Sequence, residues 1–316
     1  MPGTALRFPK VDRTEGPAAR PVAFAPEEEG ALRFVRGWHP LSPHTPFGGS
    51  SALARAGKDG FQLVGDNGYG TRLTLDSRGA VSDVRIRPLP TPDGRPARKS
   101  MIDAEAMFVD PASGKSWIAL EGINEIWRLD ADLAAIEARR KLPSLRWPSN
   151  RGPEAMVRLG DGRTLVLSED ADNDTRGREG LLYTGDPAEP GPAPIHFFYA
   201  SDGRGLVSDA APLPDGRILL VHRRLGFDPV FTTILSILDP TDIEADSIVR
   251  SRTIGRIPAP LAENYEGAAV SVEGGRTFLW LVADNNFNIW QRSLLLQFEL
   301  VDLPPKRMPD SKKAAR

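Results

Sequence analysis

Acidic residues recur in this chain beside short apolar runs, in segments about 50 residues apart. The residues that open these runs are Ser51, Glu105, Glu154, Asp209 and Glu266. Those that close the next apolar run are Asp66, Glu121, Glu169, Arg223 and Asp284. Eight of these ten residues are carboxylates. A purely structural role would need only small or apolar residues at these positions, so the acids indicate a functional site.

Carboxylates that lie close together repel one another and raise one another's pKa values unless they share a proton or a cation. A hard divalent cation relieves this repulsion, and Ca²⁺ accepts about 6–8 oxygen ligands, including carboxylates and amide carbonyls. We therefore predict a site for a divalent metal ion, with Ca²⁺ as the expected ion. The expected ligands are Asp66, Glu105, Glu154, Glu266 and Asp284. The alternative is that these acids cap strand ends or form ion pairs with nearby arginines.

Three residues beside these acids suit the chemistry of hydrolysis. Arg223 is expected to steady developing negative charge, and His222 or a spare carboxylate such as Glu169 to act as the general base. Arg223 and Arg224 together also suit a phosphate group, because guanidinium groups match its oxygen atoms. Two other interpretations stay open: His222 as a packed residue of the rim, and the arginines as salt-bridge partners of the acids.

A second group of acids follows Glu169. Asp170, Asp172 and Asp174 match the first three ligand positions of an EF-hand loop. The match then fails, because Thr175 stands where the glycine is needed and Leu181 where the bidentate glutamate is needed. This loop is either a separate Ca²⁺ site or a polar rim.

The segments that must position these residues form a repeat. Each acidic segment is followed by a Gly/Asp turn and a second β-rich run, as in Ile218–Val221 after the turn PDGR. Third and fourth runs follow, as in Glu125–Leu129 with Ile136–Lys141 and in Thr232–Leu238 with Ile248–Ile254. Four antiparallel strands repeated every ~40–50 residues are the signature of propeller blades. Because the first two strands of a blade are antiparallel neighbours, the start of one and the end of the other lie on the same face.

The sequence therefore predicts an all-β fold, a β-propeller of five four-stranded blades. The fifth unit is one strand short, and Ala31–Trp38 is expected to supply its outer strand, so that no sheet edge is exposed. Six blades remain an alternative if Pro21–Phe24 and Ile195–Tyr199 belong to an additional blade. We expect residues 1–30 to be an N-terminal extension, residues 31–303 to form the propeller and residues 304–316 to be a disordered basic tail.

Composition excludes several classes of function. A net charge of −2 and a pI near 6.2 argue against a general nucleic-acid binder. The lack of cysteine excludes thiol nucleophiles, disulfides and cysteine-type zinc sites. No G-x-S-x-G, H-E-x-x-H or complete P-loop motif is present. No run approaches the about 18 apolar residues of a membrane-spanning helix, and residues 1–21 lack the apolar core of an export signal.

Seven short segments resemble those of one bacterial family. They are FGGSSAL (47–53), GDNGYG (65–70), DAEAM (103–107), GPEAM (152–156), SED (168–170), NYEGAAV (264–270) and VADNNF (282–287). In order and spacing they resemble the "esterase-like activity of phytase" family, also called phytase-like domain proteins, over roughly residues 30–302. The resemblance implies a β-propeller hydrolase that acts on esters or phosphoesters with a metal such as Ca²⁺.

The resemblance also implies site residues and a location. Glu105, Glu154 and Glu266 correspond to the family's E-A/G motifs, and Asp66 with Asn67 to its D-N/R-G motif. Many members of the family are exported, which implies a periplasmic or secreted protein. The chain as written has no signal peptide, which favours the cytoplasm instead.

The residues and the resemblance together lead us to expect a metal-dependent hydrolase. Its expected partner is a small-molecule ester or phosphoester, with no nucleic acid and no membrane span, and the chain is expected to act as a monomer. Two alternatives stay open: a Ca²⁺-dependent propeller that opens lactones, and a non-enzymatic propeller that binds a ligand or protein and uses the metal to rigidify its channel.

Overall fold

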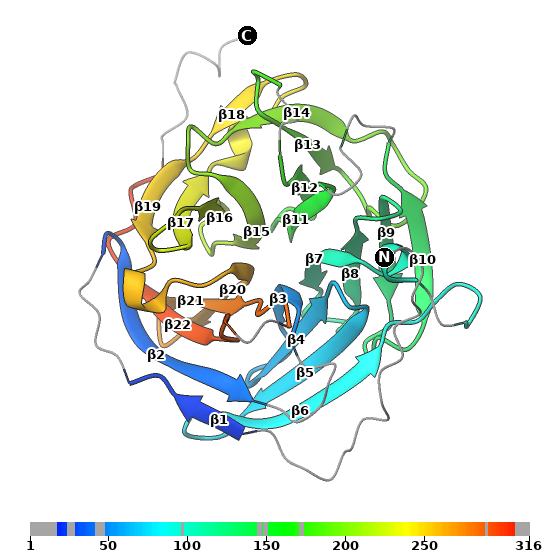
Figure 1. The fold of residues 1–316 in the computed structure, drawn as a ribbon. Coiled ribbons are helices and arrows are strands. Elements are labelled where there is room, and N and C mark those ends of the chain that lie inside the picture. Colours follow the sequence, from blue (N-terminus) through cyan, green and yellow to red (C-terminus); the bar gives the residue numbers. More distant parts are fainter. Residues whose placement is uncertain are drawn as a thin grey trace.

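The computed structural model describes residues 18–23, 29–41, 48–95, 98–143, 147, 151–170, 174–287 and 290–306. In these residues the chain forms 22 strands, in five sheets. The sheets stand around a common axis like the blades of a propeller (Figure 1). The predicted all-β propeller with five blades is confirmed.

The blades follow one another in chain order. The first consists of β3 (Ser50–Arg55), β4 (Gly60–Gly65), β5 (Tyr69–Leu75) and β6 (Val81–Pro88). The second consists of β7 (Ala104–Val109), β8 (Ser116–Leu120), β9 (Glu125–Leu129) and β10 (Ile136–Lys141). The third begins with β11 (Pro153–Arg158), β12 (Thr164–Ser168), β13 (Arg178–Tyr183) and β14 (Ile195–Ala200). The fourth consists of β15 (Leu206–Pro212), β16 (Ile218–Leu225), β17 (Phe231–Leu238) and β19 (Arg252–Arg256).

The fifth blade joins the two ends of the described chain. It consists of β20 (Tyr265–Glu273), β21 (Arg276–Ala283), β22 (Leu295–Leu300), β2 (Leu32–Leu41) and β1 (Ala18–Pro21). As predicted, β2 pairs antiparallel with β22 and closes the ring (Figure 1). β1 pairs with the outer side of β2. Residues 18–21, which we expected in an N-terminal extension, therefore belong to this blade.

The six-blade alternative and one strand assignment are wrong. Ile195–Tyr199 does not start an additional blade, because β14 is the fourth strand of the third blade. The run Ile248–Ile254 is split into two strands. β18 (Ile248–Arg250) pairs in parallel with β14, and β19 pairs with β17 in the fourth blade. The split arises because this connection crosses from one blade to the next, and β18 covers the edge of β14 that would otherwise stay unpaired.

The apolar core lies between neighbouring blades. Five clusters of buried residues fill the five spaces, such as Leu220 with Phe197 between the third and fourth blades. Both faces of each sheet are therefore covered. For this reason β8 and β12 are continuous buried runs rather than alternating ones.

The short helices and inner strands complete the scaffold. Three 3₁₀ helices are present in the described residues: η1 (Lys99–Met101), η2 (Pro240–Asp242) and η3 (Ala259–Leu261). No helix within the described ranges has the length and apolar character needed to cross a membrane.

The first strands β3, β7, β11, β15 and β20 contact one another in a closed ring. Their starting residues therefore meet around the axis.

Candidate functional site

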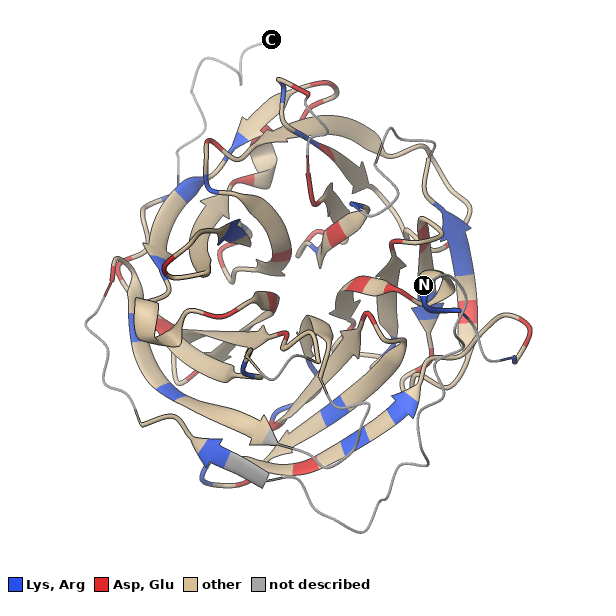
Figure 2. Cartoon of the chain, viewed as in Figure 1, with Lys and Arg blue, Asp and Glu red and all other residues tan. Residues whose placement is uncertain are grey.

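The inner strand of every blade carries one extra residue close to its start. At this point the pairing with the second strand shifts by one residue, which is a β-bulge. The extra residues are Ser51, Glu105, Glu154, Ser208 and Glu266. A β-bulge re-aims a side chain out of the regular alternation of a strand. Figure 2 shows the resulting acidic residues on the inner strands, at the centre of the ring.

Further acids lie beside the three glutamates of the bulges. Four of them directly follow the second strands of their blades, and Asp103 directly precedes β7. Oxygen atoms of Asp103, Glu105 and Glu121 all lie within 4.8 Å of one another. The remaining acids interact electrostatically with these or with one another. We call the following residues the carboxylate cluster: Asp66, Asp103, Glu105, Glu121, Glu154, Glu169, Glu266 and Asp284.

Arg223 joins two acids of the cluster. Its Nη2 donates to Oε1 of Glu169 at 2.8 Å, and its Nη1 donates to Oε1 of Glu266. Nη1 also donates to Oδ1 of Asn264 at 2.9 Å, and Asn264 in turn donates through Nδ2 to Glu266 at 2.8 Å. The side chains of Glu169 and Glu266 are only 10% and 13% exposed. Arg223 therefore holds two acids from different blades in a shielded position.

Lys99 is the second cation at the cluster. Its Nζ lies 2.6 Å from Oδ2 of Asp66 and 3.9 Å from Oδ1 of Asp103. Within the described residues, Lys99 and Arg223 are the cations that form ion pairs with the eight acids. The acids thus outnumber their cationic partners by a wide margin.

Burial, together with this excess of negative charge, raises the pKa values of several acids of the cluster. Burial, with the nearby Glu266 carboxylate, raises the pKa of Asp284 to about 8. Burial raises the pKa of Glu121 to about 7. Burial and neighbouring carboxylates also raise the pKa values of Glu105 and Glu154 well above their ordinary range. Such acids keep their protons near neutral pH unless a cation takes the place of those protons.

The cluster fits a hard divalent cation. All of its donor atoms are oxygens, which Ca²⁺ and Mg²⁺ prefer. Oδ1 of Asp66 and Oδ1 of Asp103 are buried and have no hydrogen-bond partner in the described part of the chain. The triad Asp103, Glu105 and Glu121 brings three carboxylate groups within reach of one ion. The partly buried triad can therefore hold a metal ion.

The five ligands predicted from the sequence all lie in the cluster, but they do not share one environment. Glu105 belongs to the triad, whereas Asp66 is paired with Lys99 and Glu266 with Arg223. Asp284 accepts a hydrogen bond from the Asn286 N–H at 2.8 Å. Our ligand set left out Glu121 and Asp103, although Asp103 opens the segment DAEAM two residues before Glu105. That spacing was the available signal.

His222 does not lie in the cluster. His222 and Arg223 are consecutive on β16, so their side chains point to opposite faces of the sheet. Nε2 of His222 lies 2.8 Å from Oγ of Ser236 and 3.2 Å from the hydroxyl of Tyr199. Burial lowers the pKa of His222 to about 3. The residue is thus a neutral, buried link between the third and fourth blades, and this position does not favour the general-base role that we had assigned to it.

Asp209 is also outside the cluster. The bulge of the fourth blade leaves Ser208, not Asp209, in the position that Glu105 and Glu154 occupy in their blades. Asp209 is 1% exposed and accepts from the N–H groups of Ala210 and Ala268, at 2.7 and 2.6 Å. It therefore joins the inner strands β15 and β20.

Asp209→Asn is expected to lower the free energy of unfolding by about 1–2 kcal/mol, because the amide replaces one acceptor with a donor that faces a backbone N–H. On the hypothesis that the carboxylate cluster binds Ca²⁺, the Ca²⁺ affinity should stay unchanged, since the cluster is intact. Urea unfolding together with calorimetric Ca²⁺ titration checks both parts. A large loss of Ca²⁺ affinity in a folded variant would show that Asp209 takes part in the metal site, against its placement outside the cluster.

The acidic loop after β12 is only partly described, since Asp172 lies outside the described residues. Asp170 forms an ion pair with Arg151. Asp174 pairs with Arg176, 2.7 Å from Nη2, and this hydrogen-bonded guanidinium lowers the pKa of Asp174 to about 2. Two of the three expected Ca²⁺ ligands in this loop are therefore engaged with arginines.

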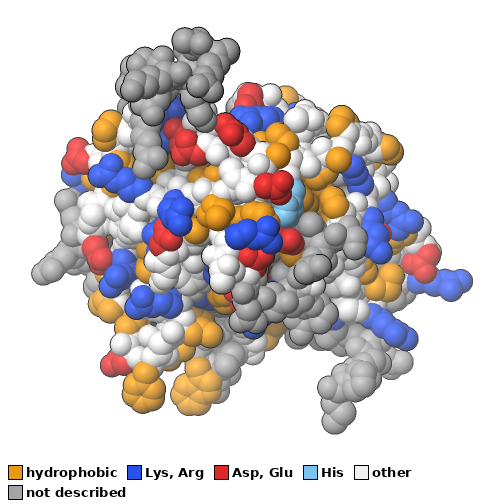
Figure 3. Space-filling view, turned by 90° about the horizontal axis from the view of Figure 1, so that it is seen from above, with side chains coloured by type: hydrophobic (Ala, Val, Ile, Leu, Met, Phe, Trp, Pro, Cys, Tyr) orange, Lys and Arg blue, Asp and Glu red, His pale blue; other side chains and the backbone are white. Residues whose placement is uncertain are grey.

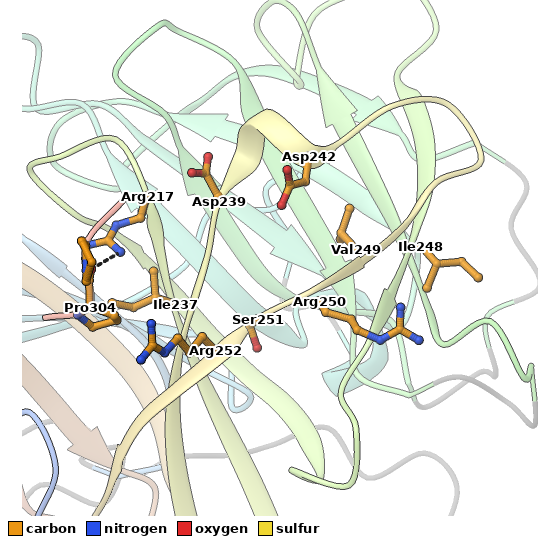
Figure 4. A pocket seen from close by; sticks show the side chains of 11 residues that line it. Arg217, Ile237, Asp239, Asp242, Ile248, Val249, Arg250, Ser251, Arg252 and Pro304 are labelled. Atoms are coloured by element: carbon orange, nitrogen blue, oxygen red, sulfur yellow. Dashed lines mark hydrogen bonds between the residues drawn. The ribbon is translucent and has the colours of Figure 1, made fainter. Parts of the chain in front are cut away.

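A pocket of about 390 Å³ lies elsewhere, among the outer strands of the third and fourth blades. Figure 4 shows Arg217 directed toward Pro304, and its Nη1 donates to the Pro304 carbonyl at 2.7 Å. Nε of Arg250, another lining residue, lies 3.5 Å from Oδ1 of Asp202. The pocket shares no residue with the carboxylate cluster.

Solved structures with a similar fold include several propellers. A thermostable family-43 glycoside hydrolase has a TM-score of 0.55 at 10% identity, covering 85% of this chain and 99% of that one. The PQQ-bound aldose sugar dehydrogenase from Streptomyces coelicolor has a TM-score of 0.50 at 14% identity, covering 87% of this chain and 99% of that one. These likenesses show the propeller fold alone. No curated protein matches the chain.

The family match is more specific than the fold. The model of the phytase-like family, described as esterase-like activity of phytase, matches residues 45–287. The matched range contains all eight acids of the carboxylate cluster, together with Lys99 and Arg223. This range also covers more than half of the chain, and the chain therefore belongs to the phytase-like family.

Proposed function

We propose that this protein is a divalent-metal-dependent hydrolase of carboxylic or phosphoric esters, with Ca²⁺ as its metal. The observation that supports this most is the carboxylate cluster, in which eight acids meet two cations and two buried carboxylate oxygens lack a hydrogen-bond partner in the described residues. The family description, esterase-like activity of phytase, points to the same class of reaction.

Asp103, Glu105 and Glu121 are the residues that would hold the ion. A bound divalent cation polarises an ester oxygen and lowers the pKa of water. Hydrolysis of this kind needs no side-chain nucleophile, which agrees with the lack of cysteine and of a serine-hydrolase motif.

Arg223 and Glu154 are assigned the other roles. Arg223 places a fixed positive charge beside Glu266 and Glu169, where it can stabilise negative charge that develops on the ester. Glu154 has no ion-pair partner in the described residues, and burial with neighbouring carboxylates raises its pKa. A carboxyl group of this kind takes up a proton more readily than an exposed one, and it can pass that proton on as a general acid or base. Glu169 is engaged by Arg223, so Glu154 is the better candidate for this role.

The test compares chelator-treated protein with the same protein after addition of Ca²⁺. The substrates are p-nitrophenyl acetate, p-nitrophenyl phosphate and γ-butyrolactone, which represent acyl esters, phosphoesters and lactones. We expect hydrolysis of at least one of them only with the added ion. Glu105→Gln should weaken Ca²⁺ binding in calorimetry, whereas Glu154→Gln should keep binding and lose turnover.

Two results would speak against the proposal. Ca²⁺ binding without turnover of any substrate would favour a propeller that binds a ligand and uses the ion for rigidity. No Ca²⁺ binding and no effect of the chelator would remove the metal site altogether. Turnover of the lactone alone would keep the site and narrow the reaction to ring opening.

A further inference from the structure

Phe287 lies at the edge of the carboxylate cluster. A Cβ atom built on Gly49 would lie 2.5 Å from Cε2 of Phe287 and 2.7 Å from Oδ1 of Asp66. The aromatic ring and the carboxylate group therefore pack against the same glycine. Gly49 has a φ of +60° and offers no side chain that would separate the two groups.

The backbone holds Phe287 in an uncommon conformation. Asn286 and Phe287 have φ values of 47° and 51°, in the left-handed region that residues other than glycine rarely adopt. The N–H of Asn286 donates to Oδ1 of Asp284 at 2.8 Å. Oδ1 of Asn285 accepts from the N–H groups of Phe287 and Gly49, both at 3.2 Å. Strained conformations of this kind persist where the surroundings over-determine them, and they cluster at ligand sites.

The ring is not needed for the core. Phe287 is 46% exposed, whereas Trp280 and Phe278 of the preceding strand β21 are 1% and 3% exposed. A half-exposed aromatic ring next to an acidic cluster matches the usual composition of small-molecule sites, in which apolar walls accompany a few polar groups.

The charges at the cluster limit what the site can accept. Lys99 is paired with Asp66, and Arg223 is paired with Glu169 and Glu266. Each cation already balances acids of the cluster, so little positive charge remains for a substrate with several phosphate groups, which the surrounding acids would repel. A substrate with one reacting ester and an apolar remainder suits this environment better than a polyanion.

We propose that Phe287 forms an apolar wall of the substrate site and that the substrate is an ester with an aryl or similarly bulky apolar group, which packs on this ring. This inference rests on the proposed hydrolase function. Asp284, Asn285 and Gly49 act as positioning residues for the ring through the contacts given above.

The first measurement is binding, which does not depend on turnover. Fluorescence titration of Ca²⁺-loaded protein with 2-naphthol, a neutral aryl probe, should show about 10-fold weaker binding in Phe287→Ala than in the unmodified chain. Phe287→Leu should recover part of this loss, because it keeps an apolar surface. The matched control is Phe227→Ala, which removes a phenylalanine that is 99% exposed on the β16–β17 hairpin and should change binding less than 2-fold.

The second measurement is turnover of two esters that differ in their apolar group. For 2-naphthyl acetate, Phe287→Ala should lower kcat/KM about 10-fold, mainly through KM, whereas for methyl acetate the change should stay within 2-fold. Unchanged 2-naphthol binding in folded Phe287→Ala, or an equal loss in Phe227→Ala, would overturn the apolar wall. Weaker 2-naphthol binding without hydrolysis of any ester would support the wall and count against the hydrolase alone.

Discussion

Replacing Arg223 with methionine is expected to lower the free energy of unfolding by about 3–5 kcal/mol at pH 8 in Ca²⁺-free protein. Methionine fills a similar volume but leaves Glu169 and Glu266 without the guanidinium that now donates to both. Two partly buried carboxylates then face each other and the rest of the cluster without a fixed positive charge. Removing one partner of a buried ion pair costs far more than removing an exposed one, because the remaining charge stays poorly solvated.

Urea unfolding at pH 8 and at pH 5 measures this effect. The loss should be smaller at pH 5, because burial raises the pKa of Glu266 and this acid can take up a proton in place of the lost cation. Arg85→Met is the matched control, because the Arg85 side chain is 81% exposed and forms an ion pair with Asp83. In that pair Nε of Arg85 lies 3.0 Å from Oδ2 of Asp83. Exposed pairs contribute about 0–1 kcal/mol. A loss below about 1 kcal/mol for Arg223→Met at pH 8 would show that the Arg223 guanidinium does not stabilise Glu169 and Glu266 as a buried ion pair.

The Ca²⁺-free protein is expected to lose stability as the pH rises from about 5 to about 8. Asp284 and Glu121 have pKa values raised to about 8 and about 7 in the folded chain, against about 3.9 and 4.3 in an unfolded chain. The folded state therefore binds more protons than the unfolded state in this window. Stability is fully present below the unfolded pKa values and is lost as the pH rises toward the folded ones. The combined loss should reach several kcal/mol.

His222 acts in the opposite direction at lower pH. Its pKa is lowered to about 3 in the folded chain, so its contribution to stability is lost as the pH falls from about 6.5 toward 3. Because two acids outweigh one histidine above about pH 4, the optimum of the Ca²⁺-free protein should lie near pH 4. Ca²⁺ should restore about 3 kcal/mol at pH 8 when it is present at 100 times its dissociation constant.

Denaturant unfolding between pH 4.5 and 8.5, with chelator and with Ca²⁺, checks this profile. Asp284→Asn serves as the control, because an amide does not titrate and should flatten the decline between pH 5 and pH 8. Stability of the Ca²⁺-free protein that increases over this range would show that the acids are ionised without strain, and the case for a metal site would fail.

The sequence alone determined the fold to a large extent. The repeat of short apolar runs and Gly/Asp turns predicts five blades, because each blade is built from local hairpins whose signals lie within a few residues. The missing strand of the fifth unit likewise predicts the closure by Ala31–Trp38, most of which lies in β2. The run Ile248–Ile254 could not be divided from its composition, since its two halves are equally β-rich and differ only in the blade with which each one pairs.

For the site, the sequence indicated most of the acids that meet, but neither the full set nor how they are used. Glu105, Glu154 and Glu266 follow from the repeat, whereas the exchange of Asp209 for Ser208 depends on the register of one bulge. A shift of one residue turns a side chain to another face without any change in local pattern. His222 and Arg223 are neighbours in the sequence, and only the direction of β16 separates the buried histidine from the arginine at the cluster.

The tertiary structure alone decided the contacts between distant segments. Lys99 reaches Asp66, Asn264 supports Arg223, and Phe287 packs against Gly49 near the opposite end of the chain. The physical reason is that closure of the propeller places residues from different blades side by side around one axis. The local periodicity of the sequence predicts only on which face of its own strand each side chain lies.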